Sequence, residues 1–505
     1  MNRIIPATMA TQHPDNACAP YWEKDGDGFV STHEEVEECY SAFADLDCQE
    51  FMWDWEGKYV DEAVVDKIFH SFYGYFKKHQ LGKDKFLTFR IPNIWHERGY
   101  GLARALMGIL TAESFARDLK FHTPPLFEVI LPMTDKAENI IYIQKTFTKL
   151  ANFKCKLFKD PCYFNYLNVL PLLEGIDDLI NCKKLLERYL SIHKKIYKHK
   201  PEYLRLHIAR SDPALNSGLV PAVVAGKIAL SEYYKFGKKH GIKIFPAIGV
   251  GTLPFRGSLS PERINDFLKE YAGIKTVYIQ SAFRYDFPLP KVKRAIKELN
   301  KKLQKTSATL YDQSEIDAGV LICKTFAPIY KKTVEAIADK INQVSKQVPG
   351  RRERKLHIGL FGYSRGVGKK KLPRAIPFTA VLYSLGIPPE LIGTGRGLKE
   401  LQRHNIKHNI KLEDYYLNFR KDIILASRYL NKENLNQLAD SNRGWKGIKE
   451  DVEILENYLN IELGPKKNSD FIHRNISSNI FYLLKAKKSV TKEIIESGKI
   501  RHSLG

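Results

Sequence analysis

Eight short apolar segments, separated by stretches with helical periodicity, constrain the fold of this chain more than any other feature. We predict a first strand that starts at residues 4–5 and ends near His13, and further strands at residues 86–91, 126–132, 204–209, 242–248, 276–279, 356–361 and 390–392. Strands that alternate with helices predict a parallel sheet. Eight such units predict a closed (β/α)8 barrel of the TIM type, with its chemistry at the C-terminal strand ends. An open doubly wound sheet is the alternative.

Helical patterns fill the intervals between these strands. In residues 60–78, Val65, Ile68, Phe69, Phe72 and Phe76 recur at the spacing of an amphipathic helix. Further helices are predicted at residues 96–119, 136–200, 220–240, 261–271, 291–305, 327–348 and 375–385. The third and fourth strands are ~75 residues apart, against ~30 for a βαβ unit, so we expect large helical insertions in the barrel.

The last hundred residues show helical patterns and no convincing strand. We therefore expect a catalytic barrel over residues 1–400 and a mainly helical region, packed on the barrel, over residues 401–505. No internal repeat or low-complexity segment interrupts either part.

Composition excludes several classes of protein. Of the 505 residues, 44% are hydrophobic and 11% aromatic, which excludes wholesale disorder. No apolar run reaches the ~18 to 20 residues that cross a bilayer, and the N-terminal residues lack the apolar core of a secretory signal. The seven cysteines form no CxxC pair and are interpreted as reduced thiols. We expect a cytoplasmic protein without a membrane partner.

The formal net charge is +23, which is compatible with nucleic-acid binding. The basic residues, however, are spread through helical segments, and no nucleic-acid motif or basic tail is present. We interpret the charge as a solvated surface that also attracts anionic substrates, and we predict no nucleic-acid partner.

One histidine stands out at the end of the first strand. Residues 8–17 read TMATQHPDNA, so His13 directly precedes Pro14. The residue before proline is pushed to an extended conformation, which places His13 where a strand passes into a loop. A histidine there is suited to act as a base, because it titrates near neutral pH. A lone polar surface residue is the alternative.

Arginines and one aspartate follow the other strands. Arginine presents a planar fork that binds phosphate or carboxylate at two points. Asp212 supplies an oxygen ligand suited to magnesium or manganese. The loops at residues 362–371 and 393–397, GYSRGVGKKK and GTGRG, have the glycine-rich character of phosphate sites. The set collected from strand ends is His13, Arg90, Asp212, Arg256, Arg284, Arg365, Arg374 and Arg396. Neither a Walker motif nor a dinucleotide fingerprint is present.

Together these motifs resemble the phosphoenolpyruvate carboxylase family, specifically its shorter archaeal type. TMATQHPDNA, EVILPM, SDPALNSG, QSAFRYD, GYSR and PRAIPF occur in the family's order over essentially the whole chain. The long bacterial and plant carboxylases are more distantly similar. Their TAHPTE histidine matches His13, and the arginines of DIRQES, HGRGGTVGRGG (the second), GSRPAKR and LRAIPW match Arg90, Arg256, Arg365 and Arg374. The aspartate of YSDSAKD matches Asp212.

The chain departs from the long enzymes at several positions. Ile248 and Val250 stand where HGRGG has its histidine and first arginine, and Leu215 replaces the lysine of SDSAKD. The metal-binding glutamate that follows PLF in the long enzymes falls at Met133 or Thr134. We therefore take Asp135 as the substitute metal ligand.

The resemblance implies an Mg²⁺-dependent (or Mn²⁺-dependent) and irreversible carboxylation of phosphoenolpyruvate by bicarbonate, an anaplerotic fixation of CO2 that yields oxaloacetate and phosphate through carboxyphosphate and enolpyruvate. It implies catalytic roles for His13, Arg90, Arg256 and Arg365. Substrate binding is expected from Arg284, Gly362, Ser364 and Arg374, and metal binding from Asp135 and Asp212. A homotetramer is also implied. Another barrel lyase acting on phosphoenolpyruvate or an oxoacid is the alternative function.

Overall fold

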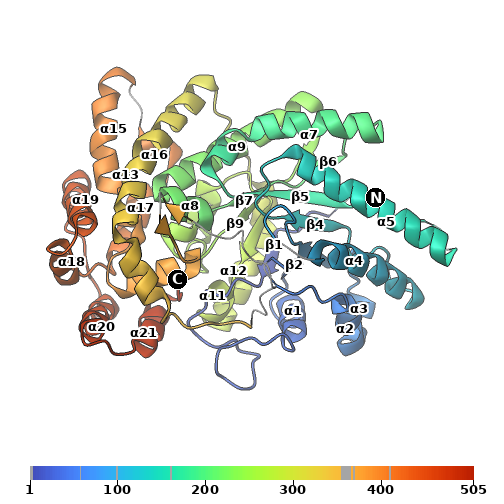
Figure 1. Cartoon of the computed structure of the whole chain (residues 1–505), viewed down its shortest axis with the longest axis horizontal. Coiled ribbons are helices and arrows are strands. Elements are labelled where there is room, and N and C mark those ends of the chain that lie inside the picture. The colour runs from blue at the N-terminus through green and yellow to red at the C-terminus, as the bar shows by residue number, and fades with distance from the viewer. Residues whose placement is uncertain are drawn as a thin grey trace.

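The computed structural model describes residues 4–56, 58–97, 100–159, 162–353, 366–367, 370–408 and 411–505. At its centre, eight parallel strands close into a barrel in the order β1-β10-β9-β7-β5-β4-β3-β2 (Figure 1). The strands are β1 (Thr8–Thr11), β2 (Glu50–Asp54), β3 (Phe86–Arg90), β4 (Glu128–Leu131), β5 (Asn168–Leu173), β7 (His207–Ala209), β9 (Ala247–Gly249) and β10 (Thr276–Ile279). The first and last strands pair, with Thr8 opposite Val277, so the sheet has no free edge. The predicted TIM-type barrel is confirmed.

Helices surround these strands, as Figure 1 shows for α4, α5, α7 and α9. Those between the first and last barrel strands are α1 (Glu35–Ala44), α2 (Val64–Ser71), α3 (Tyr73–Lys78), α4 (Gly101–Asp118), α5 (Ala137–Phe158), α6 (Ile176–Ile180), α7 (Cys182–Tyr197), α8 (Ser211–Ser217), α9 (Leu219–His240), the 3-10 helix η1 (Pro254–Arg256) and α10 (Ile264–Glu270). Short strands β6 (Tyr203–Leu204) and β8 (Lys243–Ile244) pair beside the barrel. The predicted helix at residues 60–78 is interrupted at Phe72, between α2 and α3.

Two barrel strands lie where the sequence predicted none. Strand β5 lies within the predicted helix of residues 136–200, so that prediction was wrong in its middle. Its sequence, NVLPLL, lacks the alternation of a half-buried strand, because a barrel strand is covered on both faces. Strand β2, EFMWD, was missed because its acidic residues point into a polar barrel interior. The long interval between two predicted strands therefore contains β5 as well as helices.

One predicted strand is not a strand. Residues 390–392 overlap the 3-10 helix η3 (Pro389–Leu391). Pro388 and Pro389 have no N–H to donate to a sheet, which disfavours a strand there. The predicted strand at residues 356–361 lies outside the described residues. The barrel is therefore complete with β10, before either of these segments.

The described part of the chain after β10 is mainly helical, as was predicted for residues 401–505. It contains α11 (Ser281–Tyr285), α12 (Leu289–Lys302), η2 (Leu303–Lys305), α13 (Gln313–Ser345), α14 (Ala375–Ser384), α15 (Thr394–His408), α16 (Leu412–Tyr415), α17 (Phe419–Ser427), α18 (Lys432–Ala439), α19 (Arg443–Leu459), α20 (Asn468–Lys485) and α21 (Thr491–Arg501), with a small hairpin of β11 (Gly366–Val367) and β12 (Lys370–Lys371). Helix α13 packs on α9 of the barrel and on α14, α15 and α19. A domain division at residue 400 stays a prediction.

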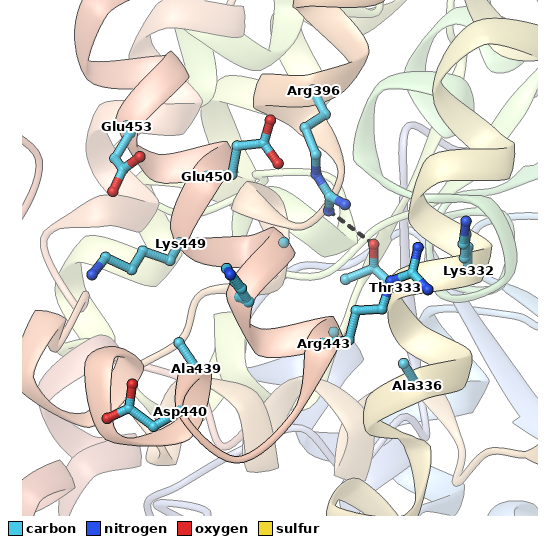
Figure 2. Close-up of a pocket in the computed structure, with 13 residues that line it drawn as sticks. Lys332, Thr333, Ala336, Arg396, Ala439, Asp440, Arg443, Lys449, Glu450 and Glu453 are labelled. Atoms are coloured by element: carbon cyan, nitrogen blue, oxygen red, sulfur yellow. Dashed lines mark hydrogen bonds between the residues drawn. The ribbon is translucent and has the colours of Figure 1, made fainter.

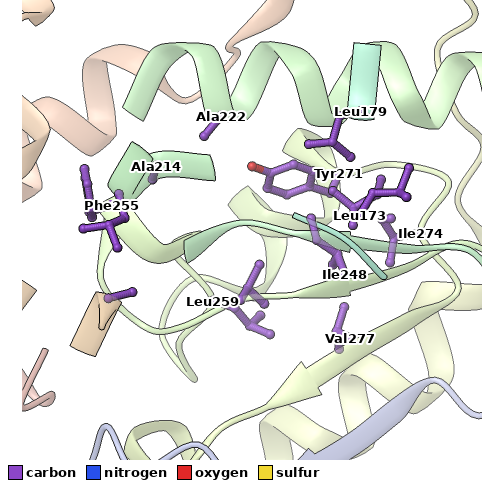
Figure 3. Close-up of a cluster of buried hydrophobic side chains, with 14 of the residues drawn as sticks. Leu173, Leu179, Ala214, Ala222, Ile248, Phe255, Leu259, Tyr271, Ile274 and Val277 are labelled. Carbon is purple, nitrogen blue, oxygen red and sulfur yellow. The ribbon is translucent and has the colours of Figure 1, made fainter. Parts of the chain in front are cut away.

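Apolar side chains fill the space between barrel and helices. Figure 3 shows Leu173, Ile248 and Val277 of three strands with Ala222 of α9 and the ring of Tyr271. Successive strand residues point to opposite faces, so the alternate residues face the barrel interior. A separate buried cluster there consists of Met9, Met52, Ile130, Leu170, Leu172, Ala209 and Tyr278.

An ionic network occupies the interior at the N-terminal strand ends. The guanidinium of Arg205 donates to Glu50 and Glu128 at 2.6 Å each, and to Thr276 at 3.1 Å. All of these side chains are buried. Charge pairs therefore fill the barrel interior at this end.

Among the described residues, no single helix combines the length and apolar composition that crossing a membrane requires. One bent pair of segments, Ala375–Ser384 with Pro389–Arg403, meets those limits jointly, at an angle of 95°. Most residues of this pair are buried in the protein core.

Candidate active site

The side chains that face the barrel interior form rows along the strands. These rows continue past the carboxyl ends of the strands into a cavity. Met9, Thr11 and His13 follow one another in one row, and Leu172 and Glu174 in another. The cavity has a volume of about 80 Å³. It is lined by His13, Glu56, Arg90, Leu172, Glu174, Ala209, Arg210, Ser211, Asp212, Gly249, Arg256, Tyr278, Gln280, Arg374, Ala375 and Ile376. TIM barrels carry their active sites at this end.

His13 lies at the end of β1 and is half-buried in the cavity wall. Its Nδ1 is 2.9 Å from Thr11 Oγ1. Burial, together with the positive charge of Arg90, holds the pKa of His13 well below its ordinary value. The imidazole is therefore neutral near pH 7. When Nδ1 donates its proton to Thr11, Nε2 keeps a lone pair that can accept a proton.

Arg90 is held rigidly by two carboxylates. Its Nε and Nη2 donate to the two oxygens of Asp54 at 2.8 and 2.6 Å, and Nη2 lies 2.8 Å from Glu56. Burial opposes the charge, but Asp54 and Glu56 outweigh it and raise the pKa of Arg90 far above its ordinary value. Within the described part of the chain, Nη1 has no hydrogen-bond partner, so it is available to a ligand.

Arg256 follows β9 in the short helix η1 and is also buried. Every nitrogen of its guanidinium donates a hydrogen bond: to Ser211 Oγ (3.1 Å), Asp15 Oδ2 (2.9 Å), the backbone oxygen of Gly505 (2.6 Å) and Gln280 Oε1 (2.7 Å). These four acceptors hold the guanidinium in one orientation at the cavity wall.

Arg374 directly precedes α14, and it lines the cavity with Ala375 and Ile376. Its charge contributes to the lowered pKa of His13. Three arginines from β3, η1 and the start of α14 thus surround the histidine.

Three carboxylates line the same cavity, and sequence reasoning missed two of them, Glu174 and Glu56, the second of which pairs with Arg90. Glu174 follows β5 and accepts the N–H of Met133 at 3.1 Å, and Asp212 lies in the first turn of α8. Asp135, the predicted second ligand, is exposed, contacts Asn139 at 3.1 Å and does not line the cavity. The segment PLLE at residues 171–174 repeats the PLF-glutamate order of the long carboxylases, but it was assigned to a helix.

Other predicted site residues lie elsewhere. Arg284 is buried behind β1, where Nη2 donates to Glu38 and to the carbonyl oxygen of Thr11, each at 2.8 Å, and it does not line the cavity. Gly362, Ser364 and Arg365 lie outside the described residues. The structure therefore brings together His13, Arg90, Arg256, Arg374 and Asp212 from the predicted set.

A second, larger hollow lies on the outer helices (Figure 2). Its volume is about 1140 Å³, and residues of α13, α15, α18 and α19 line it. Arg396 lies there and donates to Thr333 at 2.8 Å and to Asp451 at 2.6 Å. The hollow shares no residue with the barrel cavity, so Arg396 is separate from the candidate active site.

The cavity combines three kinds of group. The arginines bind and stabilise anionic oxygens, the neutral imidazole accepts a proton, and paired carboxylates supply the oxygen ligands that magnesium and manganese prefer. This combination suits reactions in which a phosphoryl group moves and an enolate forms, because both develop negative charge.

Comparison with known proteins identifies relatives over the full length of the chain. The family model described as phosphoenolpyruvate carboxylase matches residues 5–505. The phosphoenolpyruvate carboxylase of Leuconostoc mesenteroides is 39% identical over 509 residues, covering 100% of both chains. That of Metallosphaera sedula is 40% identical over 526 residues, again with 100% of both covered. That of Methanothermobacter thermautotrophicus is 36% identical, covering 85% of this chain and 88% of its own.

These matches agree with the barrel and with the residues gathered at its mouth. The chain belongs to the phosphoenolpyruvate carboxylase family.

Proposed function

We propose that the protein carboxylates phosphoenolpyruvate with bicarbonate, forming oxaloacetate and phosphate. The observation that carries this proposal is a single cavity in which a neutral His13 lies among Arg90, Arg256 and Arg374, with Glu174 and Asp212 in the same wall. Membership of the family supports the same pair of substrates.

The residues of the cavity have distinct parts in this reaction. Bicarbonate oxygen attacks the phosphorus of phosphoenolpyruvate, and the bond from phosphorus to the enol oxygen breaks, leaving carboxyphosphate and the pyruvate enolate. Arg90 and Arg256 stabilise the transferring phosphoryl group. His13 accepts the proton of carboxyphosphate, which releases CO2 and phosphate, and the enolate carbon then attacks CO2. Arg374, at the cavity wall, binds the anionic substrate.

A divalent cation, Mg²⁺ or Mn²⁺, fits the donor set of Glu174 and Asp212. Both side chains offer hard oxygen ligands, and magnesium is commonly held by one or two carboxylates together with water and substrate oxygens. The cation would supply positive charge that stabilises the enolate oxygen. We propose Glu174 in place of Asp135, because Glu174 lines the cavity with Asp212 and Asp135 does not, while the third carboxylate of the cavity, Glu56, pairs with Arg90.

The test is a coupled assay for oxaloacetate with phosphoenolpyruvate and magnesium, without nucleotide and with or without bicarbonate. Oxaloacetate that depends on bicarbonate supports the proposal. Turnover of phosphoenolpyruvate or an oxoacid that is indifferent to bicarbonate would instead identify another lyase on the same barrel.

We further propose a cytoplasmic homotetramer that binds neither nucleic acid nor membrane. This follows from the resemblance to the family and from the even spread of basic residues along the chain. Sedimentation equilibrium tests the assembly. A filter-binding titration with duplex and single-stranded DNA at low salt tests the absence of a nucleic-acid partner.

A further inference from the structure

Behind the cavity, outside its lining, lies a buried carboxyl group that the proposed mechanism does not use. Glu390 is part of the 3-10 helix η3 and has no exposed surface. In the described part of the chain no lysine or arginine pairs with it, and its Oε2 has no hydrogen-bond partner. Burial of a carboxyl group without a counter-charge destabilises the folded protein. The contacts of Glu390 therefore require a functional explanation.

Glu390 Oε1 accepts two hydrogen bonds from elements that carry cavity residues. The backbone N–H of Phe255 donates to it at 2.7 Å, and the hydroxyl of Tyr383 donates at 2.6 Å. Phe255 directly precedes Arg256 in η1, and Tyr383 belongs to α14, which begins directly after Arg374. One oxygen therefore links the two segments that present these arginines to the cavity.

The link is important for η1 because the helix is only three residues long. Its backbone N–H groups bond only within the turn, from Arg256 and Ser258 to the carbonyl oxygen of Leu253 at 2.9 and 3.0 Å and from Gly257 to that of Pro254 at 3.1 Å, while the carbonyl oxygen of Arg256 accepts from Gly251 N–H at 2.8 Å. The hydrogen bond from Phe255 N–H to Glu390 thus restricts the direction in which the side chain of the next residue, Arg256, extends from the backbone. Displacement of a binding group by about 1 Å can cost about 100-fold in rate.

The surroundings of Glu390 make its charge sensitive to pH. Burial raises its pKa to about 7, and Tyr383 and Phe255 counteract that rise only in part. The titratable groups on elements packed against η3 are Tyr383 of α14, Asp422 of α17, Arg396 of α15, Asp451 of α19 and Arg256 of η1, with Tyr330 of α13 also near. Arg256 and Arg396 are paired with Asp15 and Asp451, and the charge of Asp422 disfavours a second anion.

We propose that Glu390 is a positioning residue which, when ionised, holds Arg256 and the start of α14 in the geometry that binds phosphoenolpyruvate. The ionised carboxylate accepts stronger hydrogen bonds than the protonated acid. The site is therefore better ordered at a pH above the pKa of Glu390 than at a pH below it. kcat/KM for phosphoenolpyruvate therefore rises with pH through the titration of this group. His13 titrates at lower pH and governs a separate acid limb.

The first test is Glu390→Gln, which keeps an oxygen that accepts both hydrogen bonds but cannot ionise. We expect kcat/KM for phosphoenolpyruvate at pH 8 to fall about tenfold, mostly through KM, and the rise near pH 7 to disappear while the lower limb remains. Thermal unfolding at pH 8 should stay within a few degrees of that of the wild type. A pH profile with an unchanged rise near pH 7 overturns the proposal.

The second test is Tyr383→Phe, which removes one donor but keeps the carboxyl. Loss of that hydrogen bond destabilises the carboxylate, so we expect the rise in kcat/KM to move to higher pH. A profile that does not move contradicts the proposal, even if Glu390→Gln fails to fold.

A matched control is Glu23→Gln. Glu23 also has a pKa of about 7, but it binds the N–H of Gly28 rather than any cavity segment. The pH profile of kcat/KM for the Glu23→Gln variant should match that of the wild type. This comparison separates the effect of Glu390 from titration of the substrates. The inference rests on the proposed carboxylation. A wild-type protein that forms no oxaloacetate refutes that function, whereas active variants with unaltered profiles refute only the role of Glu390.

Discussion

At the scale of single residues, the chemistry of the cavity depends on what each ionisable side chain contacts. His13 is next to arginines and has no carboxylate within hydrogen-bond distance among the described residues, so it stays neutral. Arg90 is paired with Asp54, and Arg284 is paired with Glu38 away from the cavity. Identical side chains thus differ in role because their partners differ.

Replacement of His13 by asparagine should separate the two halves of the reaction. We expect oxaloacetate formation to fall by at least about 100-fold because the proton acceptor is lost, while phosphate release from phosphoenolpyruvate persists. Parallel assays for oxaloacetate and phosphate measure this. The exposed His70 supplies the control, since His70→Asn should behave as wild type. Unchanged carboxylation in His13→Asn would remove His13 from its role.

Replacement of Glu174 or Asp212 should weaken binding of a divalent cation. We expect Glu174→Gln and Asp212→Asn to raise the Kd for Mn²⁺ at least about tenfold, because each removes a charged oxygen ligand. Titration calorimetry with Mn²⁺ alone measures this without reliance on activity. Asp135→Asn is the matched control and should bind Mn²⁺ as tightly as wild type. If Asp135→Asn weakened the binding of Mn²⁺ and Glu174→Gln did not, Asp135 rather than Glu174 would be the metal ligand.

At the scale of elements, strand alternation determines which side chains meet. The rows that end in His13, Glu174 and Gln280 face inward because residues two apart lie on the same face of a strand. At the opposite end the same alternation directs Glu50, Glu128 and Arg205 into one another. Each strand therefore contributes both to filling the barrel interior and to building the cavity.

Removal of the central cation at the N-terminal strand ends should destabilise the barrel. Arg205→Met leaves the buried carboxylates of Glu50 and Glu128 without a counter-charge, and we expect a loss of about 3–5 kcal/mol in the free energy of unfolding. Urea unfolding followed by circular dichroism measures it. Arg403→Met breaks an exposed pair with Glu400 and should change stability by less than about 0.5 kcal/mol. Equal stability of the two variants would contradict this account.

At the scale of the whole molecule, distant parts of the chain meet at Arg256. This residue binds Asp15 beside the first strand and the backbone oxygen of Gly505 after the last helix. Leu504 N–H also donates to the carbonyl oxygen of Asp15, at 2.7 Å. The helical region after the barrel therefore contributes directly to the wall of the candidate site.

A side chain at position 505 should disturb that wall. A Cβ added to Gly505 would lie 2.2 Å from the carbonyl oxygen of Ile376 and 2.7 Å from the backbone N of Ala380. Residue 505 must then move, and Arg256 loses an acceptor. We expect Gly505→Ala to lower kcat/KM about tenfold with little change in unfolding temperature. Gly74→Ala, where a Cβ meets nothing within 4 Å, is the control; equal activities would exclude this contact from function.

From the sequence, the barrel, the helical C-terminal region and the cavity residues His13, Arg90, Asp212, Arg256 and Arg374 could be predicted, because each has a recognisable local pattern. A strand that ends in a polar loop, or an arginine within a family motif, can be recognised from the sequence without knowledge of its neighbours in space. Sequence reasoning misread β5 because a strand buried on both faces has no alternation to distinguish it from a helix. Glu174 was missed for that reason, since its position depends on β5.

The class of fold, the family and the residue types at the strand ends can all be inferred from the amino-acid sequence. Which of these residues share a cavity depends on the three-dimensional packing. Arg284 turns to Glu38, 246 residues earlier in the chain, and Glu390 reaches Phe255 across 135 residues. Such partnerships depend on how helices pack around the closed barrel. Packing of distant segments also sets burial and charge, which in turn determine whether a side chain is a neutral base, a fixed cation or a structural support.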